Sequence, residues 1–201
     1  MTMKVLFIDR DGTLIEEPHD NQVDSLDKVR LVRGVIPALL ELANHGYRFV
    51  MVTNQDGLGT EAFPQAQFEA PHALVMGLFE TQGIRFDEVM ICPHLPEQNC
   101  ECRKPRTGLL TRFLAANDID LSASAVIGDR QTDMELAERI GVPGLLVNCE
   151  HEDALTWPGI VELLCYSDRR ASVQRNTNET RIAVEVNLDH ARRRAAQSTG
   201  Q

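Results

Sequence analysis

Residues 4–13 read KVLFIDRDGT and place two carboxylates, Asp9 and Asp11, at the end of a short apolar run. An apolar run that ends in a glycine turn is typical of a buried strand. Two acids this close raise each other's pKa, so the arrangement is unfavourable unless a cation lies between them or the two acids have different chemical roles. A turn in which the acids only accept backbone hydrogen bonds is the plain alternative.

Apolar strands and helical patterns alternate along the first 165 residues. Short apolar runs typical of buried parallel strands occupy 4–8, 48–52, 88–91, 125–127 and 144–147. Helical spacing of apolar residues lies between and after them, at 35–43, 64–82, 107–116, 130–140 and 157–165. This alternation predicts an α/β fold: a doubly wound, Rossmann-like parallel sheet with helices on both faces.

Polar residues stand at the carboxyl ends of several predicted strands. Asp9, Thr53, the segment that begins at Cys92, and Asp129 each follow an apolar run directly. Because ligands bind at this edge of a doubly wound sheet, we expect these four segments to build one site. Asp129 is suited to complete a site for a hard cation, and Asp133 is suited to orient the ligands from behind; a helix cap is the alternative for Asp129.

Two further motifs offer what a phosphoryl group needs. Thr53, Asn54 and Gln55 carry neutral donors suited to phosphoryl oxygens, although Thr and Asn also serve as ordinary caps. Arg103 and Lys104 would supply fixed positive charge beside the acids, with a solvated basic pair as the alternative.

In order and spacing, these motifs resemble those of the haloacid dehalogenase superfamily of phosphohydrolases. The resemblance implies that Asp9 is a nucleophile that forms an aspartyl-phosphate, and that Asp11 acts as general acid and then general base. It also implies Mg²⁺ held by Asp9, the backbone carbonyl of Asp11, and Asp129. The phosphoryl oxygens would be held by Thr53 and Lys104.

A cluster of soft ligands lies within eleven residues: Cys92, His94, Cys100 and Cys102. C-x-H and C-x-C pairs this close suit tetrahedral Zn²⁺, and four protein ligands leave no open position, so the site would be structural. The zinc would staple a loop that lacks a core of its own and direct residues 103–104 towards the phosphate. Three free or buried thiols are the alternative.

The intervals between the motifs are too short for the separate cap domain that many members of the superfamily carry. Among capless members with a zinc loop, the segment TNQDGLGT at 53–60 is similar to the histidinol-phosphatase group. The resemblance therefore implies hydrolysis of L-histidinol phosphate in histidine biosynthesis. Phosphatases of D-glycero-D-manno-heptose 1,7-bisphosphate are the alternative within the same chemistry.

The residues that would contact the substrate are less clearly marked. Glu16, Glu17 and Gln22 follow the nucleophile and could meet an imidazole and an amino group, with a solvated flap as the alternative. Asn54 and Arg103 are expected to contact the phosphate.

The last 34 residues have a different character. Residues 182–188 alternate as a strand does, and a lone strand would need a partner from outside the chain. Residues 174–182 resemble the opening strand of imidazoleglycerol-phosphate dehydratase, which implies a multifunctional enzyme whose dehydratase domain is missing here. We expect a phosphatase domain at 1–167 and a poorly ordered linker and domain start at 168–201, without dehydratase activity.

The charge of the chain limits its partners. The formal net charge is −10, and seven arginines against four acids at 166–201 leave the remainder at −13. Such a surface disfavours nucleic acid. No apolar run is long enough to span a membrane and no secretion signal is recognisable, so we expect a cytoplasmic protein without a membrane partner. A non-catalytic zinc-binding interaction module is the rival of another class.

Overall fold

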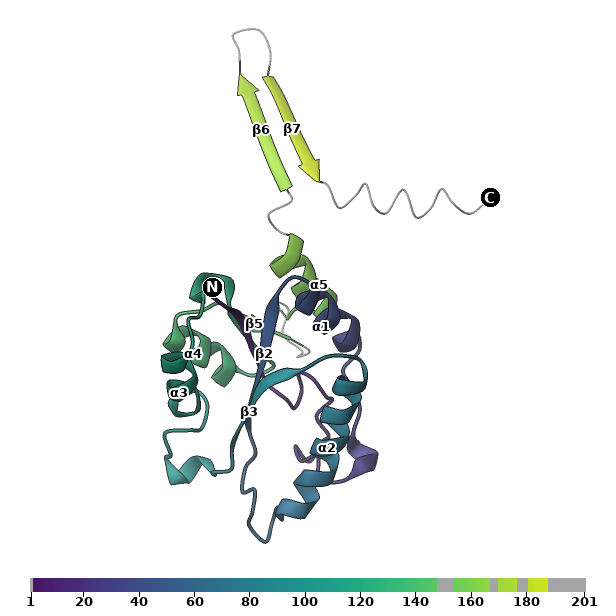
Figure 1. Cartoon of the computed structure of the whole chain (residues 1–201), viewed down its shortest axis with the longest axis vertical. Helices are drawn as coiled ribbons and strands as arrows, with labels where there is room; N and C mark the ends of the chain where they lie inside the picture. Colours follow the sequence, from purple (N-terminus) through teal and green to yellow (C-terminus); the bar gives the residue numbers. More distant parts are fainter. Residues whose placement is uncertain (1, 148–153, 167–169, 177–180, 188–201) are drawn as a thin grey trace, which may run out of the picture.

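The computed structural model describes residues 2–147 and 154–166, together with the backbone of 170–176 and 181–187. Strands and helices alternate along the chain (Figure 1). The main strands are β1 (Lys4–Ile8), β2 (Tyr47–Asn54), β3 (Phe86–Cys92), β4 (Ala125–Gly128) and β5 (Gly144–Leu146). The α-helices are α1 (Val35–Asn44), α2 (Gln65–Thr81), α3 (Gly108–Ala116), α4 (Gln131–Ile140) and α5 (Trp157–Val161).

These five strands form one parallel sheet in the order β3-β2-β1-β4-β5. In the central strand β1, Ile8 lies opposite Met51 of β2 on one side and Ile127 of β4 on the other. The chain leaves β1 and β4 towards opposite edges of the sheet. The topological switch point therefore lies between these two strands, and their carboxyl ends are where a site is expected.

Helices cover both faces of the sheet (Figure 1). Helices α1, α2 and α5 pack on one face, and α3 and α4 pack on the other. Side chains of β1 alternate between the two cores: Leu6 and Ile8 enter the first, whereas Val5 and Phe7 enter the second. The doubly wound arrangement predicted from the apolar runs is confirmed. Among the described helices, none is both long enough and apolar enough to cross a bilayer.

The observed boundaries differ from the expected ones mainly at polar ends. Strand β2 continues to Asn54 because the strand's polar end still pairs with β3, where Asn54 lies opposite Cys92. The helix expected over 157–165 is α-helical only to Val161 and continues as a π-helical turn, η4 (Glu162–Tyr166). Within the described residues only η1 (Leu26–Lys28) and α1 lie between β1 and β2, so no cap domain is inserted there.

The expected strand at 182–188 corresponds to β7 (Arg181–Asn187). It pairs antiparallel with β6 (Arg170–Asn176), and the two strands form a sheet of their own (Figure 1). The expectation that this strand lacks a partner in the chain is therefore wrong: residues 170–176 supply one, although their polar composition gave no strand signal. Residues 188–201 lie outside the described part of the chain.

Candidate active site

The segments that follow β1, β3 and β4 bring a cation and three carboxylates together. Lys104 Nζ lies 2.7 Å from Asp9 Oδ1 and 2.7 Å from Asp133 Oδ1. Carboxylate oxygens of Asp9, Asp129 and Asp133 all lie within 4.8 Å of one another. The convergence of Asp9, Lys104 and Asp129 that the strand ends predicted is thus observed. Asp133, expected to orient the ligands from behind, lies beside them and shares Lys104 with Asp9.

The charges of this cluster are only partly balanced. Burial raises the pKa of Asp129 to about 7 and that of Asp133 to about 6, and the negative charge of Asp9 adds to both shifts. Burial alone would lower the pKa of Lys104, but the carboxylates of Asp9 and Asp133 outweigh burial and raise it. Lys104 contacts Asp9 and Asp133, and Arg130 Nε lies 3.9 Å from Asp129 Oδ2. The pKa values of Asp129 and Asp133 are nevertheless raised, so these cations do not offset burial and mutual repulsion.

The donor set fits a hard divalent cation. Asp129 Oδ1 is buried and makes no hydrogen bond to any of the described residues. An unsatisfied buried carboxylate oxygen is unfavourable, and a cation is the partner that would satisfy it. Carboxylate and carbonyl oxygens are the ligands that Mg²⁺ prefers.

Gly12 permits the close approach of the two acidic segments. A Cβ at this position would lie 2.1 Å from Asp129 Oδ2, and the backbone has φ +73°, a region that disfavours side chains. Glycine is therefore required after Asp11, because any side chain at this position would prevent Asp129 from packing against the turn.

Asp11 is held by two residues, Arg10 and Gln55, whose contact with it was not predicted from the sequence. Arg10 Nη1 donates to Asp11 Oδ1 at 3.2 Å, and Gln55 Nε2 donates to Asp11 Oδ2 at 2.6 Å. Burial raises the pKa of Asp11, and the positive charge of Arg10 opposes that rise. One sequence signal pointed to Gln55: it comes two residues after Thr53 at the end of a strand, where alternate residues share a face.

Thr53 and Asn54 lie close to the cluster in different ways. Thr53 is buried, and its Oγ1 accepts a hydrogen bond from Gln55 Nε2 at 2.8 Å. Asn54 Oδ1 accepts from Lys104 N at 3.0 Å, and its Nδ2 donates to Lys104 O at 3.3 Å. Asn54 therefore fixes the backbone of the lysine that reaches Asp9.

A cavity of about 560 Å³ opens over Asp9, Asp11 and Lys104. Of the expected substrate contacts, the cavity wall includes Asn54, Arg103, Glu17 and Gln22. Two predicted site residues, Glu16 and Thr53, are not among the described residues that line the cavity. Glu16 is exposed to solvent, and Thr53 is buried.

Two ion pairs at the cavity wall were not expected. Arg103 pairs with Asp56, and Arg130 pairs with Glu17. The partners in these pairs are separated by 47 and 113 positions in the sequence, so no local motif could predict the pairs. They place both signs of charge at the entrance.

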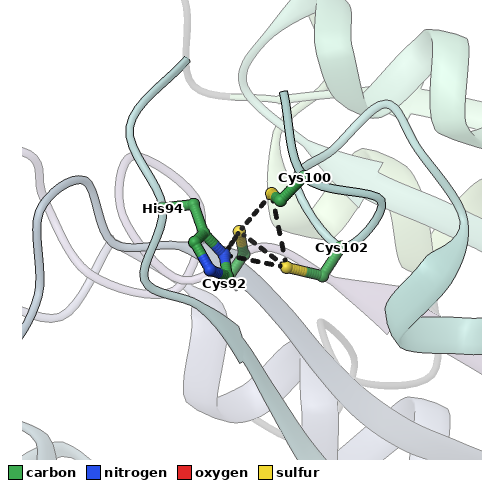
Figure 2. A group of neighbouring side chains, drawn as sticks. All are labelled: Cys92, His94, Cys100 and Cys102. Carbon is green, nitrogen blue, oxygen red and sulfur yellow. Dashed lines mark hydrogen bonds between the residues drawn. The ribbon is translucent and has the colours of Figure 1, made fainter. Parts of the chain in front are cut away.

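The predicted soft-ligand cluster is assembled as expected (Figure 2). Cys92 Sγ lies 3.2 Å from Cys102 Sγ and 3.6 Å from Cys100 Sγ, and His94 Nδ1 lies 3.1 Å from Cys102 Sγ. Ligands at about 2.3 Å from a tetrahedral Zn²⁺ would lie about 3.8 Å apart. The observed separations are shorter than this value, and all four donors face one point.

The cysteine cluster also positions the basic residues that follow it. Arg103 Nη1 donates to the carbonyl of His94 at 3.1 Å, and Arg106 Nη1 donates to the carbonyl of Cys100 at 2.7 Å. Burial raises the pKa of the Cys92 thiol to about 12, and a bound metal cation would favour its thiolate form. The cluster fits a metal, and its loop leads directly into Lys104.

Fold, site and sequence comparison define the class of the chain. Residues 101–157 match the HAD-hydrolase-like family model. The chain superposes with a TM-score of 0.71 on a D,D-heptose 1,7-bisphosphate phosphatase from B. bronchiseptica, crystallised with magnesium and phosphate, at 27% identity over 81% of this chain and 98% of that one. In sequence and in fold, the chain is therefore similar to haloacid dehalogenase-like hydrolases.

Sequence relatives are more specific. The chain is 52% identical over 186 residues, 92% of its length, to the histidine biosynthesis bifunctional protein HisB of Legionella pneumophila. It is also 52% identical over 197 residues to the protein of that name from Actinobacillus pleuropneumoniae, covering 94% of this chain and 54% of the relative. The chain thus spans about half the length of the curated relatives it matches.

Proposed function

We propose that this chain is a Mg²⁺-dependent phosphomonoester hydrolase. The observation that carries the proposal is the Asp9 carboxylate, held 2.7 Å from Lys104 Nζ beside Asp129 and facing a cavity. A carboxylate that lies beside a fixed cation is a suitable nucleophile for a phosphoryl group. Transfer of that group depends mainly on positioning and on charge neutralisation, both of which the cluster offers.

The reaction would proceed in two displacements. An oxygen of Asp9 forms a bond to phosphorus, the bond from phosphorus to the leaving oxygen breaks, and Asp11 donates its proton to that oxygen. Asp11 then accepts a proton from a water molecule that attacks the aspartyl-phosphate, which releases inorganic phosphate and restores Asp9. Lys104 and the Thr53 hydroxyl would bind phosphoryl oxygens during both steps.

Two metals would support this chemistry. Asp9, Asp129 and the backbone carbonyl of Asp11 would hold Mg²⁺, which when bound neutralises charge on the phosphoryl group. The unpaired Asp129 Oδ1 supports this assignment. The four residues of the cysteine cluster would hold a structural Zn²⁺, whose role is to fix the loop that carries Lys104.

We infer that the substrate is L-histidinol phosphate and that the pathway is histidine biosynthesis. The 52% identity to bifunctional HisB proteins over nine tenths of the chain supports this choice. Glu17 and Gln22 in the cavity wall are suited to an amino group and an imidazole. We assign no substrate contact to Glu16, because its side chain is exposed and does not line the cavity.

The matched relatives are about twice as long and are called bifunctional. We infer that residues 1–167 form the phosphatase domain and that residues from 168 onward begin the domain for a second activity, which the resemblance at 174–182 suggests is a dehydratase. A small-molecule substrate and a cytoplasmic location accord with this role.

Steady-state turnover of two substrates tests the proposal. With L-histidinol phosphate and D-glycero-D-manno-heptose 1,7-bisphosphate compared at equal Mg²⁺, we expect kcat/KM for histidinol phosphate to be at least about 100-fold higher, because a site built for one polar head group rejects another strongly. The likeness to a heptose bisphosphate phosphatase makes that sugar the second candidate. A preference for the sugar would overturn the substrate assignment but leave the phosphatase chemistry intact.

A further inference from the structure

Gln55 lies where three functional segments meet. Its side chain is buried, and its Nε2 donates to Asp11 Oδ2 at 2.6 Å and to Thr53 Oγ1 at 2.8 Å. Its backbone N donates to the carbonyl of Cys92 at 2.8 Å. One residue thereby joins the turn after β1 and the end of β2 through its side chain, and the start of the cysteine loop through its backbone.

The two hydrogen bonds fix the orientation of the amide. An amide nitrogen carries two hydrogens, and both are used here, one on Asp11 and one on Thr53. The opposite orientation would point Oε1 of Gln55 at the carboxylate of Asp11 and leave two buried acceptors facing each other. Since Thr53 Oγ1 accepts from the amide, its own hydrogen remains available to an acceptor such as a phosphoryl oxygen.

Arg10 cannot orient Asp11 to the same degree. Its Nη1 contacts Oδ1 and Oδ2 of Asp11 at 3.2 and 3.4 Å, both longer than the bond from Gln55. Its guanidinium lies over the ring of Phe68, 4.9 Å from the centroid, so the position of the guanidinium is determined by this packing contact. Arg10 supplies charge, whereas the bond from Gln55 is short and acts on a single oxygen.

We propose that Gln55 is a positioning residue, whose amide holds the Asp11 carboxyl in the orientation needed to protonate the leaving oxygen. The inference deepens the proposed function and rests on it. Gln55 lies in the cavity wall, but both hydrogens of its amide are taken by Asp11 and Thr53, so it would act through Asp11. Proton donation contributes most when the leaving oxygen is strongly basic, as in an alkyl phosphate, and little when the leaving group is an acidic phenol.

Gln55→Met tests the assignment, because methionine keeps the length of the side chain and removes both donors. We expect kcat/KM for L-histidinol phosphate to fall about 30-fold, as displacement of a catalytic group does, while kcat/KM for p-nitrophenyl phosphate changes less than about threefold. The inhibition constant of inorganic phosphate should stay within about twofold. Thr53→Ala is the matched control, since it removes the other acceptor of the same amide and should lower both substrates alike.

A double-mutant cycle separates positioning from a structural role. In an Asp11→Asn background, Gln55→Met should cause no further loss with histidinol phosphate, because the group it orients can no longer donate a proton. Should Gln55→Met fail to fold, Gln55→Asn takes its place: its amide is one methylene too short to reach Asp11, and the same selective loss is expected.

The possible results overturn different statements. Equal losses with both substrates, or an undiminished loss in the Asp11→Asn background, would show that Gln55 does not act through Asp11, with the phosphatase proposal intact. Wild-type protein that hydrolyses neither phosphate ester would overturn the proposed function and this assignment together.

Discussion

The carboxylate cluster around Asp9 and the cysteine cluster around Cys92 are two candidate metal sites built in opposite ways. The first draws its acids from the ends of β1 and β4, joined by Lys104, and lies beneath a cavity. The second takes all four donors from residues 92–102 and has no position left for a substrate. The carboxylate cluster is suited to a metal ion that exchanges, and the cysteine cluster is suited to a metal ion that stays bound.

The difference shows how folding contributes to each site. The carboxylate cluster exists only because the sheet brings distant strand ends together, and burial beside other acids raises the pKa values of Asp129 and Asp133. The cysteine cluster takes its donors from one short stretch of chain, which leads directly into Lys104, the cation of the other site. The two sites are therefore unequal: loss of the cysteine cluster should damage both, whereas loss of the acids should leave the zinc in place.

The largest expected effect is on the nucleophile. Asp9→Asn keeps the size of the side chain but removes the attacking charge, and we expect kcat for histidinol phosphate to fall at least about 10⁴-fold, as when other nucleophiles are removed. Zinc content should not change. Phosphate release under initial-rate conditions gives the measurement.

Asp87→Asn is the matched control for Asp9→Asn. Asp87 is also paired with a basic residue, Arg48 at 2.7 Å, but on an exposed part of β3 away from the cavity. Its replacement should leave kcat unchanged. If Asp9→Asn kept more than about 1% of the activity, the covalent route would be wrong and a non-catalytic zinc module would become the better interpretation.

The second effect concerns the cysteine cluster. Cys100→Ser removes one of four ligands, and we expect loss of bound zinc together with a fall in unfolding free energy of about 3 kcal/mol, or about 6–12 °C in Tm. Activity should fall as well, because the loop that carries Lys104 loses its anchor. Metal analysis and differential scanning calorimetry measure the two effects.

Cys165→Ser provides the comparison, since Cys165 lies outside the cluster. It should keep one zinc per chain. If the wild-type protein carried no zinc and melted at the same temperature as Cys100→Ser, the cysteine cluster would not be a structural zinc site.

The third effect tests the approach of the two acidic segments. In Gly12→Ala the new Cβ would meet Asp129, and alanine would have to adopt the φ of +73° that glycine has here. We therefore expect the free energy of unfolding to fall by about 2–3 kcal/mol and Mg²⁺ to bind more weakly. Gly83→Ala has a similar φ of +81° with no atom within 4 Å of the new Cβ, and it should lose only about 1 kcal/mol. Urea unfolding measures both.

An Asp129→Ala background makes the test sharper. Removal of the carboxylate that the new Cβ meets should bring the effect of Gly12→Ala down to that of Gly83→Ala. If the two glycine variants were equally stable with Asp129 in place, the close approach of Gly12 to Asp129 would not contribute to stability.

The two clusters also differ in how far the sequence could predict them. The cysteine cluster was predicted in full because its spacing is local and its ligands are chemically distinctive. The sheet was predicted because strands buried on both faces must be apolar along their length. Within the carboxylate site, Asp9 and Asp129 followed from strand ends, but the sharing of Lys104 between Asp9 and Asp133 depends on side-chain directions that no pattern encodes.

The contacts that were missed join residues far apart in the chain. Gln55 meets Asp11 across 44 positions, and Arg130 meets Glu17 across 113, so each pairing is decided by tertiary packing. The strand β6 was missed for another reason: its sequence, RASVQRN, is polar, and only its pairing with β7 makes it a strand.

The smallest expected effect is the pH dependence of Mg²⁺ binding, which separates the exchangeable site from the closed one. Burial raises the pKa of Asp129 to about 7 and that of Asp133 to about 6, above the ordinary value near 3.8. The metal-free fold therefore holds protons that the unfolded chain has lost, and its stability should fall as pH rises from about 4 to 7. Mg²⁺ must displace these protons, so it stabilises the fold more at higher pH.

At about ten times its dissociation constant, Mg²⁺ should add about 1.4 kcal/mol at pH 7.5, a rise of about 3–6 °C in Tm, and clearly less at pH 5.5 with the same metal concentration. Thermal melts with and without Mg²⁺ at the two pH values measure the difference. Asp129→Asn, which cannot ionise, should reduce both the stabilisation and its pH dependence, whereas zinc content should be equal under all these conditions. An equal Mg²⁺ effect at both pH values would mean that the acids are already ionised in the metal-free protein, and the contrast in charge balance between the two clusters would then be lost.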